Sequence, residues 1–550
     1  MNRRTSLARM FGQQQQKVAT KPMQTTNVSL NPYQGAWTLE QAAHLLRRTT
    51  FGPTPTQIKE AVRDGLEGTI AKLFAERPTV DPPIYFNYED DPNVPNGETW
   101  INHIEDNDIA GMRAKRRQSL LAWVSKNIYE SGQTITIREK MTLFWMNHFV
   151  VSNPVRSRMF YEHNMILRNH ALGDFKKMTA EITVNAAMLV YLNGNQNSKN
   201  APNENYSREL LELFTIGKGP LAGPGDYTNY TEQDVAELAR ALTGWRFYTN
   251  NDRDPSDSVF LPNRHDTGAK QLSHRFDNVV ITDGGAEEYK TVIDIIFQKA
   301  EVARFISRKI YAWFLHSTID SEVETHIIEP MAQLLIANNY EIQPTVAALV
   351  TSEHFYDQSF RGCMVNHPAD FYFKLVNTFG VEMPADPIEQ YYKFLIFNNN
   401  MKNMEMAMFY APTVAGWKAF YQAPQYSKIW ISSVTLPLRQ NYSDRFVRGF
   451  NSRQLRTEID VINFVAQLDN PTDPNDMISE LATFLFSQPI TEAQLIALKR
   501  VILPAGFEDY NWTEEYSNFI GGDESLRNLI EDKLKALIKT MLRMPEFYLV

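Results

Sequence analysis

The sequence predicts a mainly α-helical protein, a large helical body with a small antiparallel β-hairpin insertion around residues 245–282. Three observations lead to this prediction. Apolar residues recur at helical spacing through most of the chain, in stretches bounded by capping residues, glycine or proline. Between residues 245 and 282, β-branched and alternating segments are separated by Asn, Asp, Pro and Gly. No repeat of fixed period is visible, which disfavours a regular solenoid.

The expected helices follow from this spacing and from local start signals. Thr38 and Gln41 have the spacing of a capping box, and Thr231 with Asp234 marks a second start. Residues 78–99 and 218–229 are expected to be loops. Before the insertion we expect helices at residues 38–49, 56–64, 103–131, 134–151, 157–170, 174–182, 203–216 and 231–244. After it we expect helices at 287–299, 301–316, 321–338, 342–353, 367–379, 387–398 and 402–409, and a C-terminal helical part from about 475 with helices at 475–486, 491–502 and 523–543.

Composition excludes several classes of protein. Hydrophobic residues make up 43% of the 550 residues and charged residues 22%, as in ordinary folded proteins. A net charge of −9 argues against a general nucleic-acid-binding surface. The single cysteine, Cys363, excludes an internal disulfide and a cysteine-based zinc or iron–sulfur site. No stretch reaches about 18 consecutive apolar residues, so no membrane span is expected.

Residues 1–36 are expected to form a disordered tail because they are polar, rich in glutamine and without pattern. Residues 3–7 resemble the start of a twin-arginine export signal. The apolar run of about 7–15 residues that such a signal needs does not follow. We therefore favour the cytoplasm, with the periplasm or envelope as the alternative.

The helix expected at 203–216 carries the densest group of ionisable residues. Pro202 and Asn203 supply its start and Gly217 its end. At about 100° per residue, its polar residues fall on one stripe opposite an apolar face. This stripe is either a solvated, salt-bridged face or part of a buried polar site. Its members are Asn205, Arg208, Glu209 and Glu212.

Three further groups have comparable chemistry. On the first helix, His44, Arg47 and Arg48 share a face that would suit an anion or partner carboxylates, and the alternative is an exposed, mixed-charge face. His148 follows aromatic residues, which favours a buried core histidine over a ligand or catalytic base. Around Asp266 the chain has turn chemistry, but His265 and Lys270 add more ionisable groups than a turn requires.

We hypothesise that these four groups converge in one polar site. Its catalytic candidates are Glu209, His265, Asp266 and His148, with Glu209 or His265 as the general base. The arginines would hold an anionic or oxyanionic group. The ligand-binding candidates are His44, Arg47, Arg48, Asn203, Glu204, Asn205, Arg208, Glu212 and Lys270. A hydrolase-like reaction is the leading hypothesis, and the rival is a non-catalytic partner or assembly factor with a buried ion-pair network.

No cofactor or tightly bound metal is expected. The chain lacks a His-Glu-x-x-His motif, a nucleophile elbow, a phosphate-binding loop and a dinucleotide fingerprint. The carboxylates of the four groups are accompanied by arginines and a lysine in comparable number. These cations nearly balance the charge and would repel an added divalent ion.

Seven ordered motifs resemble a bacterial family, the domain-of-unknown-function family 1800. They occupy residues 44–54, 144–149, 201–213, 239–245, 265–270, 411–417 and 544–547, and so span nearly the whole chain after about residue 36. The family's activity is unassigned. Many members carry export signals and are encoded beside a second family similar to the alkaline phosphatases and sulfatases. The resemblance therefore implies an envelope-related role and a possible partner from that second family.

Overall fold

Helices form most of the computed structural model, which describes residues 27–86, 93–95, 97–103, 105, 111–152, 156–247, 258–452 and 455–550. The mainly α-helical prediction is confirmed. Up to the insertion, the helices are α2 (Leu39–Thr49), α3 (Pro55–Leu73), α4 (Met112–Gly132), α5 (Arg138–His148), α6 (Ser157–Asn169), α7 (Phe175–Thr183), α8 (Ala186–Tyr191), α9 (Asn205–Glu209) and α10 (Glu232–Ala241). A π-helical turn, Leu210–Thr215, continues α9.

After the insertion the helical body resumes. Its helices are α11 (Glu288–Phe297), α12 (Ala300–Phe314), α13 (Ser321–Val323), α14 (Glu329–Ala337), α15 (Ile342–Val350), α16 (Pro368–Phe373), α17 (Pro387–Asn403) and α18 (Thr435–Arg448). The C-terminal part adds α19 (Val461–Val465), α20 (Pro474–Leu485), α21 (Glu492–Ile502), α22 (Asp509–Ile520) and α23 (Arg527–Arg543).

Local start signals were right in some places and wrong in others. The capping box of Thr231 and Asp234 begins α10 as predicted. At α2 it does not form, because Thr38 donates to the side chain of Gln41 instead of accepting a backbone amide. The helix expected at 402–409 is absent because Glu405 and Phe409 adopt positive φ angles of 73° and 61°. Helices α8, α18, α19 and α22 were not predicted.

The β-hairpin insertion is confirmed as two short antiparallel pairs. Strand β3 (Trp245–Phe247) pairs with β4 (Ser258–Phe260), and β5 (Lys270–Gln271) pairs with β6 (Val280–Ile281). Two more hairpins lie outside it, β1–β2 (Leu221–Gly223, Asp226–Tyr227) and β7–β8 (Phe450–Ser452, Leu455–Thr457). The first of these occupies a segment that was predicted to be a loop.

The expected disordered tail is wrong for residues 27–36. This segment lies against the chain that follows α15, where the backbone amide of Tyr33 donates to Thr351 (2.8 Å) and that of Glu353 donates to Asn31 (2.8 Å). The ring of Tyr33 also packs on Tyr356, with 4.4 Å between centroids. These contacts could not be seen in the sequence because their partners are more than 300 residues away. Residues 1–26 lie outside the described part of the chain.

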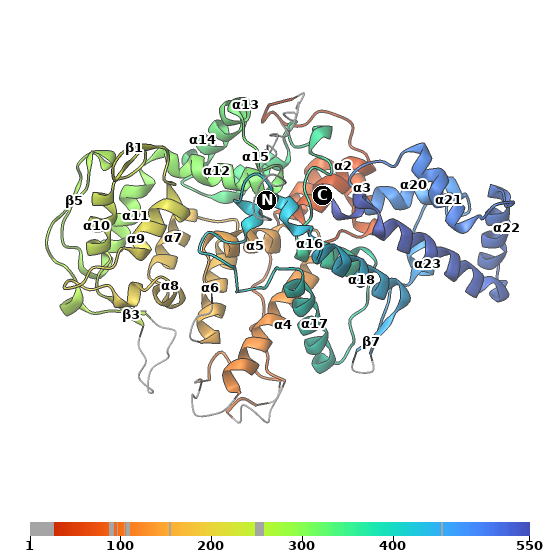
Figure 1. The fold of residues 1–550 in the computed structure, drawn as a ribbon, viewed down its shortest axis with the longest axis horizontal. Helices are drawn as coiled ribbons and strands as arrows, with labels where there is room; N and C mark the ends of the chain where they lie inside the picture. The colour runs from red at the N-terminus through yellow and green to blue at the C-terminus, as the bar shows by residue number, and fades with distance from the viewer. Residues whose placement is uncertain are drawn as a thin grey trace, which may run out of the picture.

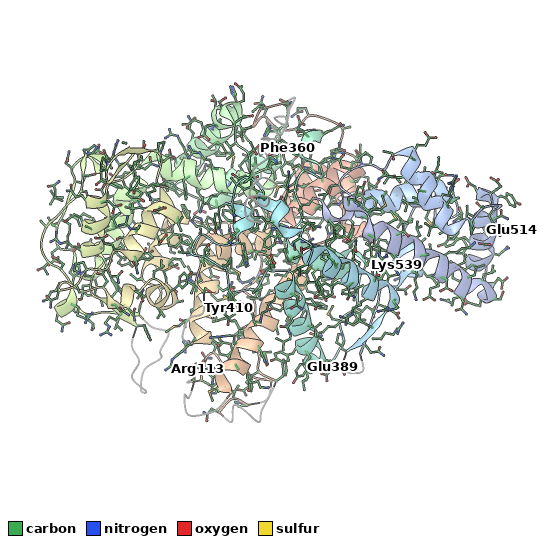
Figure 2. The ribbon with its side chains drawn as sticks, viewed as in Figure 1. Arg113, Phe360, Glu389, Tyr410, Glu514 and Lys539 are labelled. Carbon is green, nitrogen blue, oxygen red and sulfur yellow. The ribbon has the colours of Figure 1, made fainter. Side chains whose placement is uncertain are left out.

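The helices are arranged in three regions along the longest axis (Figure 1). At one end lie α7–α11 with the hairpins labelled β1, β3 and β5, and at the other end lie α20–α23. Helices α2, α5, α12 and α16 lie between them. The chain after α15 belongs to this middle region, as the position of Phe360 shows (Figure 2). Among the helices that the structure describes, none is long and apolar enough to cross a membrane.

Close backbone approach explains one glycine of the first motif. Gly52 follows α2 with a positive φ of 72°, and a Cβ there would lie 2.7 Å from the backbone of Phe373 and Lys374. Only glycine fits both requirements without a shift of backbone. Gly52 therefore lets the end of α2 pack directly on α16, which brings Arg47 and Arg48 into the middle of the molecule.

Candidate functional site

A cavity of about 270 Å³ opens in the middle region, between α5, α12 and the chain around residue 420. Aromatic side chains make up much of its wall, among them Phe144, Trp313 and Phe420. Its polar lining includes His148, Arg308 and Lys309. A volume of this size is sufficient for a small ligand.

Lys309 and His148 are held together by the end of the π-helical turn. The Lys309 ammonium or amine donates to the carbonyl of Leu213 (2.9 Å) and lies 3.2 Å from Nδ1 of His148. Nε2 of His148 donates to the carbonyl of Phe214 (3.0 Å). These carbonyls belong to the last turn of a helix that ends at Gly217, where φ is 69°, so they lack intrahelical partners. The predicted helix end thus positions two side chains from α5 and α12.

Burial lowers the pKa of Lys309 to about 7. Burial and the neighbouring charge of Lys309 together hold the pKa of His148 well below its usual value. His148 is therefore neutral, and Lys309 exchanges its proton near neutral pH. A lysine of this kind can act as a base, as an acid or as a nucleophile.

A smaller cavity of about 30 Å³ adjoins the first one and shares five lining residues with it, including Trp313, Phe420 and Tyr426. Arg47 and Arg48 of α2 line it. Arg47 donates to the carbonyl of Thr483. Arg48 donates to carbonyls at Leu315 and Phe360 and lies 3.0 Å from the sulfur of Met364.

Three more ionisable side chains complete the wall of the smaller cavity. Asp370 forms an ion pair with Lys140, and its carboxylate lies 2.9 Å from Nε2 of His367. His367 and Lys140 outweigh the effect of burial and hold the pKa of Asp370 at about 2. Burial lowers the pKa of Lys140 despite this partner. The group therefore keeps one carboxylate ionised inside the protein.

The other predicted residue of α2, His44, does not line either cavity. Its ring is buried, donates from Nε2 to the carbonyl of Phe355 (3.0 Å) and packs on that residue's ring. Burial, and then the charges of Arg48 and Arg361, lower its pKa well below the usual value. The face expected to be either exposed or ligand-binding is buried, and His44 fixes the helix to the chain after α15.

The polar stripe of the 203–216 helix lies in another region, at the surface beside α10. Arg208 pairs with Glu204 (3.0 Å) and with Glu232 of α10 (2.7 Å). Glu212 contacts Lys218 and accepts from the hydroxyl of Tyr230. Burial and the charge of Glu212 raise the pKa of Glu209. Asn203 accepts the amide of Asn205, as expected at a helix start.

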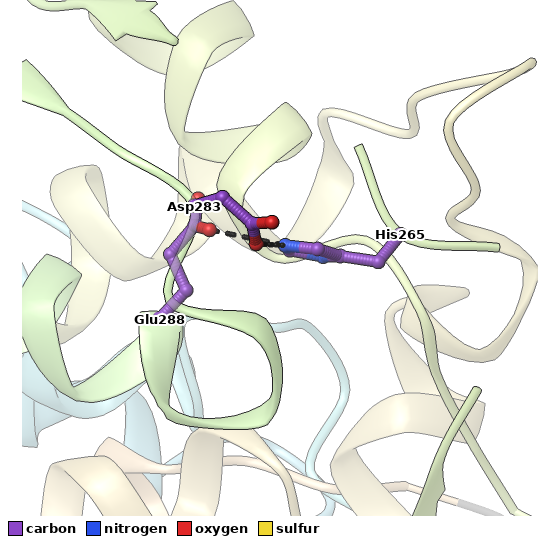
Figure 3. Close-up of side chains that lie close together, drawn as sticks. All are labelled: His265, Asp283 and Glu288. Carbon is purple, nitrogen blue, oxygen red and sulfur yellow. Dashed lines mark hydrogen bonds and ion pairs between the residues drawn. The ribbon is translucent and has the colours of Figure 1, made fainter. Parts of the chain in front are cut away.

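A third group surrounds His265 at the base of the hairpin insertion (Figure 3). Nδ1 of His265 donates to the carbonyl of Thr243 (2.9 Å), while Nε2 lies 3.0 Å from Glu288 and 3.5 Å from Asp283. Lys270 lies 2.6 Å from the other oxygen of Glu288, and both side chains are 0% exposed. Asp266 points away from this group and pairs with Arg240 (2.8 Å).

His265, Asp283 and Glu288 are the described residues whose spacing fits a metal ion, since their ligand atoms all lie within 4.8 Å of one another. A histidine anchored through Nδ1 to a carbonyl is typical of metal ligands. Lys270 competes with a metal for the Glu288 carboxylate. A network of His265, Lys270 and the two carboxylates satisfies the same atoms, so the geometry permits both a metal site and an ion-pair network.

The hypothesis of one convergent site is therefore wrong. Through the described part of the chain, most candidates occupy three places: the central cavities, the surface stripe beside α10, and the group around His265. His44 instead packs on Phe355, and Asp266 pairs with Arg240. The helices α2 and α9 lie in different regions of the fold (Figure 1). Each polar group finds partners on elements near it, and side-chain reach limits such contacts to a few ångströms. The catalytic and ligand-binding roles of these residues remain predictions.

Several cavity residues were missed in the sequence. Lys309 has aromatic neighbours at both i−4 and i+4, Phe305 and Trp313, and that position in an apolar stripe was an available signal. His367 precedes Pro368 and caps α16 through the amide of Asp370, a spacing that resembles a capping box. Nothing local distinguished Lys140 or Glu288.

Comparison with known proteins agrees with the motifs. The family described as "Protein of unknown function (DUF1800)" matches residues 44–549, nearly the whole chain. Neither the curated proteins nor the solved structures gave a match. The chain belongs to the DUF1800 family.

Proposed function

We propose that this protein binds an anionic small molecule in the two adjoining central cavities. The observation that carries the proposal is an imbalance of charge. Among the described side chains that line the cavities, one is a carboxylate, Asp370. Four are cationic residues, namely Arg47, Arg48, Lys140 and Arg308, and Lys309 adds a positive charge in its protonated form.

Two of these cations are already neutralised by the protein. Lys140 pairs with Asp370, and Arg308 pairs with Glu301 and Glu324. Arg47, Arg48 and Lys309 have carbonyl, sulfur or imidazole partners but no described carboxylate within ion-pair distance. Arg47 and Arg48 are buried, and buried cations without a counter-ion are costly, so a bound anion would relieve that cost. Guanidinium groups also suit carboxylate and phosphate oxygens.

The same cavity has groups suited to acid–base chemistry. Lys309 titrates near neutral pH, and His148 offers a second nitrogen 3.2 Å from it. A hydrolase-like reaction on an envelope-related substrate, which the family resemblance suggests, would use Lys309 as the base in place of Glu209 or His265. Both nitrogens of His265 face other groups, which makes it a weaker candidate.

Thermal unfolding in the presence of anions tests the proposal. At constant ionic strength, the midpoint temperature of unfolding of the wild-type protein should rise by mass action when phosphate, sulfate, citrate or malonate is added. Arg48→Met and Lys309→Met should reduce the shift. Arg304→Met is a matched control, since Arg304 lies on the same helix but pairs with Glu329 outside the cavities. Equal shifts in all four proteins would refute the proposal, as would the absence of any shift in the wild type.

A non-catalytic role remains the second candidate, and the paired surface residues favour it. Arg208 pairs with both Glu204 and Glu232, so its positive charge is not available to an anionic substrate. Such a network fixes the orientation of α9 against α10. A partner from the alkaline-phosphatase and sulfatase-like family would be tested by gel filtration of the mixed purified proteins, where co-elution is the expected result.

A further inference from the structure

We propose that Lys309 is a nucleophile that forms an imine with an aldehyde or ketone, and that Arg47 and Arg48 hold an anionic group on the same molecule. This inference rests on the proposed binding of an anion and names the class of that anion. It concerns residues of α2, α5 and α12 that face the two cavities.

The hydrogen bonds of Lys309 leave its lone pair available. Nε2 of His148 donates to the carbonyl of Phe214, so Nδ1 of this neutral ring is an acceptor. Lys309 therefore donates one hydrogen to His148 and one to the carbonyl of Leu213. A neutral amine has two hydrogens and one lone pair. Once both hydrogens are engaged, the lone pair is the free position of an amine that lines the larger cavity.

The charges around Lys309 favour that neutral amine. On its own helix, Arg308 is occupied by Glu301 and Glu324, whereas the ring of Phe305, 4.7 Å from the Lys309 nitrogen, favours the charged form. From α5 the facing group is His148, which is neutral. The described carboxylates lie beyond ion-pair distance of Lys309. Lys309 is half-buried, and partial removal of water without a counter-ion is one way in which a lysine becomes a nucleophile.

The positions of Lys309 and Leu315 along α12 give a rough length for the ligand. Arg48 donates to the carbonyl of Leu315, directly after the last residue of α12. Lys309 lies six residues earlier, and at about 1.5 Å per residue this is roughly 9 Å along the helix axis. Trp313 and Phe420 line the space at both ends. A carbonyl compound with a phosphate or carboxylate several bonds away has the required length and charge.

The step balances without an oxidant or a reductant. The Lys309 lone pair attacks the carbonyl carbon, a C–N bond forms as the C=O π bond breaks, and one of the two amine protons passes to the oxygen. The nitrogen of the resulting carbinolamine then forms the C=N bond, the C–O bond breaks, and the second amine proton leaves with the hydroxyl group as water. His148 is a positioning residue here, because it accepts the hydrogen bond that orients the amine.

Trapping with pyridoxal 5′-phosphate and borohydride tests the inference. This probe is an aldehyde with a phosphate group, and reduction converts its imine into a stable adduct that peptide mass mapping locates. At pH 7.5 we expect Lys309 to be labelled at least about tenfold faster than exposed lysines such as Lys290, whose ammonium pairs with Glu287. Lys374 is an internal control, since it is buried but donates to carbonyls outside the cavities.

Benzaldehyde, which has no charge, separates this inference from the proposed function. We expect both aldehydes to label Lys309 selectively. Arg48→Met should slow the labelling by pyridoxal 5′-phosphate and leave the labelling by benzaldehyde unchanged. Labelling of Lys309 that does not depend on Arg48 or on the phosphate would refute the anionic part. If anions shift the unfolding temperature but Lys309 is not labelled selectively, the nucleophilic role of Lys309 is refuted while the proposed anion binding still holds. Mapping is done on folded variants, and Arg47→Met replaces Arg48→Met if the latter does not fold.

Discussion

Replacing Lys270 by methionine should destabilise the protein strongly, because it leaves the carboxylate of Glu288 buried without its closest cation. Both side chains are fully buried, with 2.6 Å between Nζ and Oε1. Methionine nearly matches the shape of lysine, so little packing is lost. The change therefore isolates the electrostatic contribution of the pair.

The structure gives the expected size of this effect. Removing one partner of a buried ion pair costs about 3–5 kcal/mol. His265 lies 3.0 Å from Glu288, and the amide of Gly284 donates to the same oxygen (3.0 Å). These groups continue to stabilise the carboxylate, so we expect the free energy of unfolding to fall by about 3 kcal/mol. Combining the change with Glu288→Gln removes the charge and should bring stability back to within about 1 kcal/mol of wild type.

Urea unfolding followed by tryptophan fluorescence and far-UV circular dichroism measures this difference, provided that both probes give the same midpoint. Lys290→Met is the matched control in the same region, since Lys290 pairs with Glu287 at the surface. We expect no measurable change for the control. A Lys270→Met protein as stable as the control, or a double variant less stable than Lys270→Met, would refute the reasoning.

Three other predictions follow from particular contacts. Elemental analysis of the purified protein should show no stoichiometric zinc, iron or manganese, because Lys270 already neutralises the Glu288 carboxylate; a bound metal that disappears in His265→Ala would contradict this. For Lys309, the folded-state pKa of about 7 lies below that of the unfolded chain, so unfolded protein binds more protons between these values. Lys309→Met should therefore have a higher free energy of unfolding than wild type, by an amount that is largest below pH 7 and vanishes above about pH 10.5. A difference that does not depend on pH would contradict the lowered pKa of Lys309. Gly416→Ala should lower the free energy of unfolding by about 1–3 kcal/mol, because φ is 92° and the new Cβ would lie 2.6 Å from the backbone oxygen of Asn147. Gly223→Ala is the control, since the space around Gly223 is open, and it should lower that free energy by less.

Local signals in the sequence predicted much of the fold. The capping box at Thr231 and the turn at Gly217 set the ends of two helices, and both depend on atoms within a few residues. The hairpin insertion was predicted for the same reason, since alternation and turn residues are local properties. Helices whose pattern is weaker, such as α18 with its mixed polar face, were missed.

The candidate site was predicted only in part. His148, Arg47 and Arg48 were among the predicted site residues, and each lines a central cavity, while their roles remain predictions. Their partners are backbone carbonyls from distant elements, which carry no mark in the sequence. Lys309 was not predicted, although it lines the larger cavity with His148.

The sequence by itself determined the helical class, the place of the insertion and the membership of the family, because these depend on spacing and order along one chain. Only the tertiary structure decided which charges are compensated. Glu288 pairs with Lys270 inside the protein, while Arg48 lies between carbonyls from residues 315 and 360. Whether a charged group has a counter-ion depends on distances of a few ångströms between elements far apart in the chain. That difference, which the sequence does not record, separates the ion-paired group around His265 from the central cavities, where Arg47 and Arg48 have no described carboxylate within ion-pair distance.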